Sequence, residues 1–198
     1  PVFAKTMGHP LDHLGITVCS VAGTNFQPYA KFLTSIGIPF AVVTDWDPEE
    51  KGKKALGINR SLKLVETIER INTGDNPTAL MKKLKAMAEE DVDTFCELCE
   101  SFGVFSNFHT LEVDLFKYND FTQFYIIQTL RAQKFGTERK GWIDSWEANP
   151  ESLDVEKYLA LVETVGKGRF AQRLASQVAG IVPPDYIKGA IKFVVSRV

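Results

Sequence analysis

The sequence predicts an α/β fold with a small parallel sheet and an added helical part. The first sign is a strand–turn–helix–strand order over residues 16–43, with strands predicted at 16–21 and 38–43 and a helix at 26–36. That order builds parallel sheets with right-handed crossover connections. The second sign is that both strands are continuous apolar runs, which is typical of strands buried on both faces. The third is helical periodicity along most of the remaining chain.

The other elements follow from the spacing of apolar residues and from glycine. The helix at 26–36 is expected to end at Gly37, where a left-handed cap is favoured. Charged residues and glycines predict a loop at 48–60. Residues 103–106 are predicted as a third strand, and residues 110–116 as an edge strand because apolar and polar side chains alternate. Further helices are predicted at 61–71, 77–101 (one or two helices), 120–135, 137–147, 153–165, 167–178 and 184–197.

These elements predict an α/β core that is interrupted by helical segments. Residues 1–57 form the first part of the core, and residues 102–118 supply further core strands. Helical segments at 58–101 and 119–165 lie outside this core. The C-terminal helices at 166–198 are expected to pack on it.

The composition excludes several classes of protein. The 198 residues include 23 Lys and Arg against 25 Asp and Glu, a formal net charge of −2 that argues against binding nucleic acid through bulk positive charge. The net charge does not exclude binding of nucleic acid through local basic patches. No apolar stretch of about 18 residues occurs, so no membrane span is expected. Three cysteines are too few for a disulfide framework and favour a reducing, cytoplasmic compartment. Cys96 and Cys99 lie in a helical pattern, which favours core packing over a zinc or redox site.

Two carboxylates follow the predicted strand at 38–43, at Asp45 and Asp47. Ligands bind beyond the carboxyl ends of strands in open α/β sheets. Two hard oxygen ligands this close suit Mg²⁺, which takes one or two carboxylates together with waters and substrate phosphates. A pair of solvated turn acids is the competing explanation. Phosphatases of the haloacid-dehalogenase type also use Asp-x-Asp, but they usually carry Thr or Val where this chain has Glu49.

Glu112 and Asp114 form a second acidic pair, on the predicted strand at 110–116. Alternation along a strand would put both carboxylates on one face. Two such pairs can hold two divalent ions about 4 Å apart, the spacing for in-line attack on a phosphodiester. An exposed strand face with ordinary charges is the competing explanation.

Taken in order, these segments resemble the TOPRIM domain of the overcoming-lysogenization-defect (OLD) family nucleases. The matching segments are LGITVCSV at 14–21, GTNF at 23–26, GIPFAVVTDWDP at 37–48, HTLEVDL at 109–115 and GKGRFA at 166–171. The resemblance covers most of the chain. It implies a Rossmann-like core with a Glu motif after its first strand and an Asp-x-Asp after a later one. Asp45 and Asp47 match the second motif, whereas the first strand and its Glu would fall before Pro1.

The resemblance implies a DNA endonuclease or nickase that hydrolyses phosphodiester bonds with two divalent ions, Mg²⁺ or Mn²⁺. Asp45 and Asp47, with the upstream Glu, would hold one ion, and Asp45 would be essential to catalysis. Glu112 and Asp114 would hold the other, unless Asp114 instead orients a water or a ligand. Lys167, at a predicted helix start, matches the Lys of the family and would stabilise the transition state. An ordinary surface lysine near a helix cap is the competing explanation.

DNA is the expected partner, contacted through its backbone rather than its bases. The candidate DNA contacts are Arg169, Arg173, Arg131, Lys134, Arg139 and Lys140. Exposed ion pairs or a solvated helix face would explain these charges equally well. The resemblance also implies an N-terminal ABC-type ATPase domain in the same protein. No phosphate-binding Gly-x-x-x-x-Gly-Lys-Ser/Thr motif occurs here, so that domain is expected outside this sequence. It further implies a homodimer of the full-length protein.

Two other functions stay open at this point. A topoisomerase or primase would use the same TOPRIM core, with a strand-attacking tyrosine or a nucleotide site in addition. A module without catalysis would use the helical part for docking or dimerisation.

Overall fold

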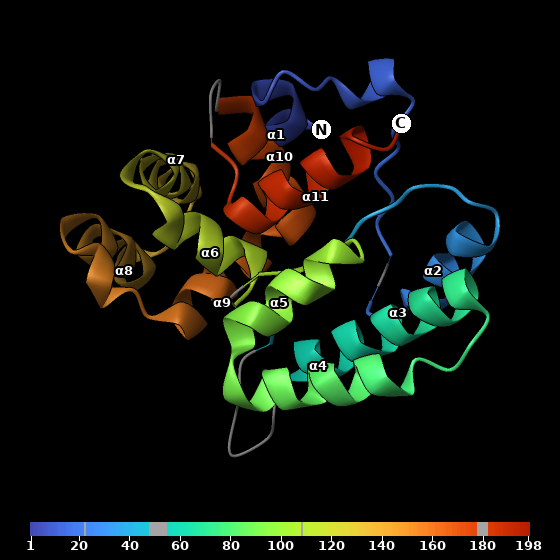
Figure 1. Ribbon diagram of the computed structural model, residues 1–198. Coiled ribbons are helices and arrows are strands. Elements are labelled where there is room, and N and C mark those ends of the chain that lie inside the picture. Colours follow the sequence, from blue (N-terminus) through green and yellow to red (C-terminus); the bar gives the residue numbers. More distant parts are fainter. Residues whose placement is uncertain (22, 48–54, 108, 178–181) are drawn as a thin grey trace. The chain divides into compact units, whose positions relative to one another are not determined.

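A computed structural model describes residues 1–21, 23–47, 55–107, 109–177 and 182–198 of the chain. It is mostly helical (Figure 1). It also carries a two-stranded parallel sheet. The α/β class with a small parallel sheet and a helical part is therefore confirmed. Within the described ranges, no helix combines the length and the apolar character that crossing a bilayer requires.

The chain divides into two compact units. The first unit comprises Pro1, residues 3–110 and residues 185–198. The second unit comprises Val2 and residues 111–184. Each unit buries its own set of hydrophobic side chains.

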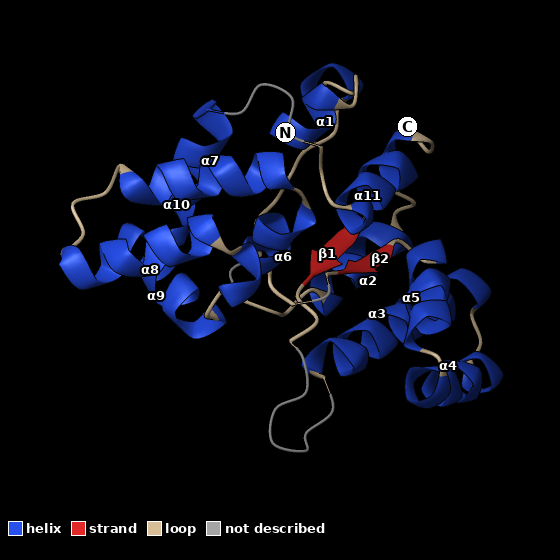
Figure 2. Ribbon diagram, turned by 90° about the vertical axis from the view of Figure 1, so that its left-hand side faces the viewer, coloured by secondary structure: helices blue, strands red, loops and turns tan. Residues whose placement is uncertain are grey.

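The sheet belongs to the first unit and pairs two short strands. Strand β1 (Val42–Thr44) runs parallel to β2 (Val104–Ser106), with Val42 opposite Val104 and Thr44 opposite Ser106 (Figure 2). Helix α11 (Asp185–Val195) packs against the sheet. The pairing aligns the carboxyl ends of both strands, so the residues that follow β1 and β2 lie side by side.

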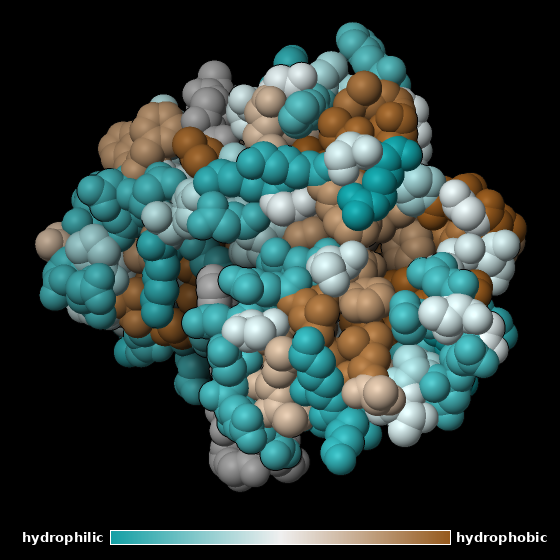
Figure 3. Space-filling view, viewed as in Figure 1, coloured by the Kyte–Doolittle hydropathy of each residue, from teal (hydrophilic) through white to brown (hydrophobic). Residues whose placement is uncertain are grey.

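The other helices described in the first unit are α1 (Val2–Thr6), a 3-10 helix at Leu11–Leu14, α2 (Gln27–Ser35), α3 (Leu56–Thr73), α4 (Thr78–Glu90) and α5 (Val92–Ser101). Helices α3 and α5 contact β2, and α2 and α4 pack against α3. Helix α3 buries Leu62, Val65 and Ile68, whose spacing of three residues keeps them on one face. Hydrophobic side chains gather between α4 and α5, and hydrophilic ones cover the outer sides of both helices (Figure 3). Burial of these amphipathic faces stabilises the unit.

The second unit is entirely helical in its described part. Its elements are α6 (Leu111–Tyr118), α7 (Asp120–Arg131), α8 (Thr137–Ala148), a 3-10 helix at Pro150–Ser152, α9 (Val155–Val165) and α10 (Lys167–Gln177). Tyr158 of α9 is fully buried, with its ring 5.3 Å from that of Phe116 and 6.1 Å from that of Trp146. Asn119 and Asp154 cap α7 and α9 by accepting backbone N–H bonds, which satisfies otherwise unpaired donors.

Most predicted elements are confirmed, with shifted bounds. The helix predicted at 26–36 is α2, and Gly37 after it has a left-handed φ of 70°. The strand predicted at 103–106 is β2, and the strand predicted at 38–43 is observed later, as β1. Two helices, α4 and α5, occupy 77–101.

Two predictions in the first 60 residues are wrong. Residues 16–21 are not a strand, because the described residues provide no neighbouring strand to which their backbone is paired, and Val18 is 63% exposed. Residues 56–60 belong to α3 rather than to a loop. The rest of the predicted loop, 48–54, lies outside the described residues.

The strand predicted at 110–116 is also wrong, since these residues form most of α6. The alternation of Leu111 to Leu115 has the period of a strand, but it is only five residues long. In the helix Val113, Leu115 and Phe116 are buried. The two acids in its first turn interact favourably with the positive end of the helix dipole.

Candidate active site

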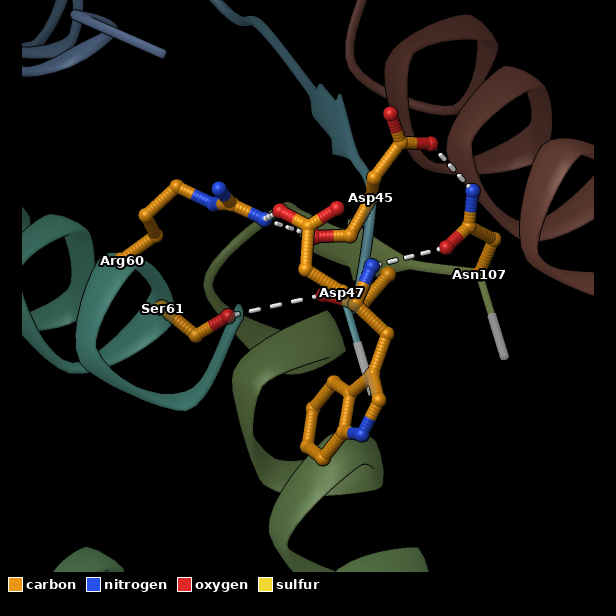
Figure 4. Close-up of polar contacts among 7 residues, drawn as sticks. Asp45, Asp47, Arg60, Ser61 and Asn107 are labelled. Carbon is orange, nitrogen blue, oxygen red and sulfur yellow. Dashed lines mark hydrogen bonds and ion pairs between the residues drawn. The ribbon is translucent and has the colours of Figure 1, made fainter. Parts of the chain in front are cut away.

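Asp45 and Asp47 directly follow β1, and a buried side chain after β2 holds the first of them. Asn107, only 3% exposed, donates from Nδ2 to Asp45 Oδ1 at 2.5 Å (Figure 4). Its Oδ1 accepts from the backbone N–H of Trp46 at 2.7 Å, and its own N–H donates to Thr44 O at 3.2 Å. One side chain therefore fixes both the backbone after β1 and the orientation of the Asp45 carboxylate.

Arg60 of α3 holds the second acid. Its Nη2 donates to Asp47 Oδ2 at 2.6 Å and also to the backbone oxygen of Asp45 (Figure 4). The Arg60 side chain is 14% exposed and the Asp47 side chain 40%, so solvent screens this ion pair only partly. Asp47 has a left-handed φ of 48°, a conformation that Asp tolerates better than most residues. Arg60 thus balances the Asp47 charge and orders the turn.

The first turn of α3 packs directly on this acidic turn. Gly57 N–H donates to Trp46 O at 2.8 Å. A Cβ atom on Gly57 would lie 2.7 Å from the same oxygen, which is shorter than real contacts allow. Glycine at 57 therefore permits the approach that puts Arg60 within reach of Asp47.

The acids of the first unit fit part of a divalent-ion site. Asp45 Oδ2 and Asp47 Oδ1 have no hydrogen-bond or ion-pair partner among the described residues. Carboxylate oxygens are the donors that Mg²⁺ and Mn²⁺ take in proteins. However, no group of three or more Asp, Glu, His or Cys side chains in the described ranges is placed to hold one ion. The two acids can supply a part of the coordination sphere, and further ligands must complete it.

In the second unit, Glu112 lies beside Lys167. The Lys167 ammonium lies 3.5 Å from Glu112 Oε1, with the two side chains 57% and 17% exposed. The Tyr158 hydroxyl donates to the backbone oxygen of Glu112 at 3.0 Å, which ties the start of α6 to α9. Burial first, and then the Glu112 charge, raise the pKa of Tyr158 well above its usual range, so this hydroxyl stays a donor. Tertiary structure thus brings together two residues that are 55 positions apart.

Asp114 does not share a face with Glu112, contrary to the expectation from a strand. Residues two apart on a helix point about 200° apart around its axis. Glu112 and Asp114 both belong to the first turn of α6. The prediction that one strand face presents both carboxylates is therefore wrong, and only Glu112 is shown beside Lys167.

The candidate DNA contacts differ in what they already bind. Arg131 pairs with Asp144 at 2.5 Å and with Glu147 at 2.6 Å, which joins α7 to α8. Arg173 donates to Gln133 Oε1. Lys134, Arg139 and Arg169 line one hollow in the second unit, and Lys140 is exposed on α8.

Comparison with known proteins gives a consistent assignment. The family model for the TOPRIM domain of overcoming-lysogenization-defect-like proteins matches residues 1–47. The solved C-terminal region of the Burkholderia pseudomallei OLD protein is 34% identical, with a TM-score of 0.82, over 100% of this chain and 90% of that one. The C-terminal region of the Xanthomonas campestris pv. campestris OLD protein, phased with mercury, is also 34% identical, with a TM-score of 0.79, over 100% and 88%. The chain belongs to the OLD family.

The OLD assignment confirms the resemblance that the sequence predicted. It also identifies Asp45 and Asp47 as acids of a TOPRIM domain. TOPRIM domains generally bind divalent metal ions and belong to proteins of nuclease and primase type. The chain corresponds to the C-terminal region of OLD proteins. No curated protein matches it.

Sequence analysis of this OLD chain missed Arg60 and Asn107. Asn107 directly follows a strand that the sequence did predict, and polar residues at the carboxyl ends of parallel strands are candidates for a site. That signal could have found it. Arg60 lies in the loop predicted at 48–60, and no pattern in the sequence links it to Asp47.

Proposed function

We propose that this chain is the nuclease domain of an OLD protein and that it hydrolyses DNA phosphodiester bonds with divalent metal ions. The observation that carries the proposal is the Asp45 carboxylate after β1, oriented by buried Asn107 in a chain of the OLD family. A carboxylate that is held in one orientation before an ion arrives loses less conformational freedom on coordination. Solvated turn acids would not require such a partner.

Bound Mg²⁺ or Mn²⁺ would activate the attacking water and stabilise charge on the phosphoryl group and on the leaving 3′ oxygen. Asp45 and Asp47, with the Glu of the first TOPRIM motif, would hold one ion. Glu112 would hold the other, with Asp114 as a further ligand or as a group that orients one. Lys167 would place its ammonium beside the phosphoryl oxygens, where charge develops in the transition state. Its contact with Glu112 supports that position.

The proposal extends to the protein that contains this domain. We propose that the nuclease acts on DNA in the cytoplasm, together with an N-terminal ABC-type ATPase domain, and as a homodimer. Phosphate contacts would come from the basic residues of the second unit, Arg131, Lys134, Arg139, Lys140, Arg169 and Arg173.

Nicking of supercoiled plasmid tests the proposal. The protein should include the TOPRIM strand and Glu motif that precede Pro1 in the resemblance, and Mg²⁺ or Mn²⁺ should be supplied. Asp45→Ala and Lys167→Ala are each expected to lower the nicking rate by about 100-fold or more. Asp75→Ala removes a charge from an exposed turn and is expected to leave the rate unchanged. Undiminished cleavage by both site variants would contradict the proposal.

A further inference from the structure

Three of the proposed DNA contacts, Lys134, Arg139 and Arg169, line one hollow of about 460 Å³ in the second unit. Its walls are the connection between α7 and α8, the first turn of α8, the end of α9 and the start of α10. This volume falls within the range of about 300–1,000 Å³ that is usual for sites of small molecules and cofactors.

The charges that line this hollow are mainly positive. Lys134, Arg139 and Arg169 line it together with one acid, Glu138, so three positive charges and one negative leave a balance of two positive. Among the described residues, none of the three cations lies within ion-pair distance of a carboxylate. Arg131, by contrast, forms ion pairs with two acids. Unpaired cations around one space repel each other, and an anion in that space would relieve the repulsion.

Two contacts hold Arg139 at the wall of the hollow. Its guanidinium lies 5.8 Å from the centre of the Phe135 ring, and its Nη1 lies 3.5 Å from Thr164 Oγ1. Helix α8 begins beside it with Gly136 as the N-cap residue, and no side chain accepts the N–H bonds of the first turn. These amides add to the positive potential that the three cations set up.

The lining favours a phosphate over the edge of a base. Gln133 carries the amide group of this lining, and both ends of that amide are engaged, since Nε2 donates to Thr129 O and Oε1 accepts from Arg173. Arg and Lys groups without such constraints contact backbone phosphates irrespective of sequence.

The hollow also lies next to the segment of the second unit that carries Lys167. Val165 and Arg169 line it, and they flank the Gly166–Gly168 segment that carries Lys167. We infer that this hollow binds a backbone phosphate of the DNA strand, next to the phosphate that is cleaved. The inference rests on the proposed function for its ligand, but it concerns binding and not the metal-dependent step.

Fluorescence anisotropy with a labelled DNA duplex in EDTA tests the inference. The double variant Arg139→Ala, Arg169→Ala is expected to bind about 10-fold or more weakly, with the slope of log K against log salt reduced by about one per lost phosphate contact. The matched control Lys82→Ala, Lys83→Ala removes two charges from α4 in the first unit and should bind as the unmodified chain does. Glu138→Gln removes the acid of the hollow and should tighten binding, by about 3-fold.

Several results would overturn the inference. They are equal loss of affinity in the double variant and in the control, no change in either, or no binding by the unmodified chain. Competition by a nucleoside monophosphate at the concentration of DNA phosphates would assign the hollow to free anions instead. Because Glu138→Gln acts in the opposite direction, a folding defect in the double variant cannot produce the whole expected pattern. Binding that depends on the hollow, without cleavage in Mg²⁺ or Mn²⁺, would contradict the proposed nuclease and leave this inference standing.

Discussion

Asn107 shows how much one buried amide can determine. Its side chain has one donor contact and one acceptor contact, and both are to the turn that carries the acids. Truncating it would leave the partly buried Trp46 N–H without its acceptor, and an unpaired buried donor costs about 1–3 kcal/mol. The same change would release the Asp45 carboxylate. Stability and metal affinity should therefore fall together at this residue.

We expect Asn107→Ala to lower the free energy of unfolding by about 2 kcal/mol and the affinity for Mn²⁺ by about 10-fold. Urea unfolding measures the first quantity, and calorimetry with Mn²⁺ measures the second. Asn59→Ala, at an exposed position of α3, is the matched control and should change neither by much. Unchanged Mn²⁺ affinity in Asn107→Ala would show that the amide does not position Asp45 for an ion.

The cysteines give a second prediction at the scale of single residues. Burial raises the pKa of the Cys96 thiol to about 11 and that of the Cys99 thiol to about 12, whereas Cys19 is exposed. The Cys96 and Cys99 thiols therefore stay protonated at pH 8, and only thiolates react quickly. A disulfide reagent at pH 8 should therefore label one thiol in the folded chain and none in Cys19→Ser. Rapid labelling of two or more thiols without denaturant would contradict this burial.

At the scale of elements, the approach of α3 to the turn after β1 is the decisive contact. It depends on Gly57 at the second position of the helix, where a side chain would meet the backbone of Trp46. It places Arg60, one turn later, against Asp47. A helix end and a strand end thus order the acidic turn jointly.

Gly57→Ala is expected to destabilise the chain by about 1–3 kcal/mol, because the backbone of Trp46 cannot move without breaking its bond to Asn107. Gly141→Ala is the matched control, since Gly141 lies within α8 and a Cβ there would meet open space. That change should stabilise by about 0.5–1 kcal/mol through helix propensity. Thermal or urea unfolding of both variants checks the opposite signs. Equal effects would show that α3 does not pack this closely.

At the scale of the whole molecule, the candidate groups are distributed over two compact units. The first unit carries Asp45 and Asp47, and the second carries Glu112 and Lys167. The overall charge is −2, yet the hollow of the second unit is lined mainly by cations. Net charge therefore predicts little about this protein's partners, whereas the local distribution of charge predicts a phosphate.

Adding a divalent ion should raise the melting temperature, and EDTA should reverse the effect. An ion at 100 times its dissociation constant stabilises the state that binds it by about 2.7 kcal/mol, or about 5–10 °C for a chain of this size. Asp45→Asn should abolish the shift, and Asp75→Asn should retain it. Scanning calorimetry measures the shift, and its absence in the unmodified protein would contradict the metal site.

Local sequence patterns predict a secondary-structure element correctly where the segment is long or the hydrophobic period repeats several times. The periodicity of α3 and α9 and the glycine after α2 predicted their elements well, because these signals depend on neighbours in the chain. The prediction of a strand at 110–116 was wrong because five alternating residues fit either a strand or a helix. Residues 16–21 failed because a strand also needs a partner, and apolar composition alone does not supply one.

The sequence by itself determined the fold class, the family, and the acids that follow β1. Only the tertiary structure decided that Asn107 holds Asp45 from 62 residues away, that Arg60 pairs with Asp47, and that Lys167 lies beside Glu112. The physical reason is that hydrophobic periodicity indicates which face of a segment is buried, and it depends only on residues close together in the chain. Contacts between polar groups of different segments depend on how helices and strands pack, which no single segment encodes.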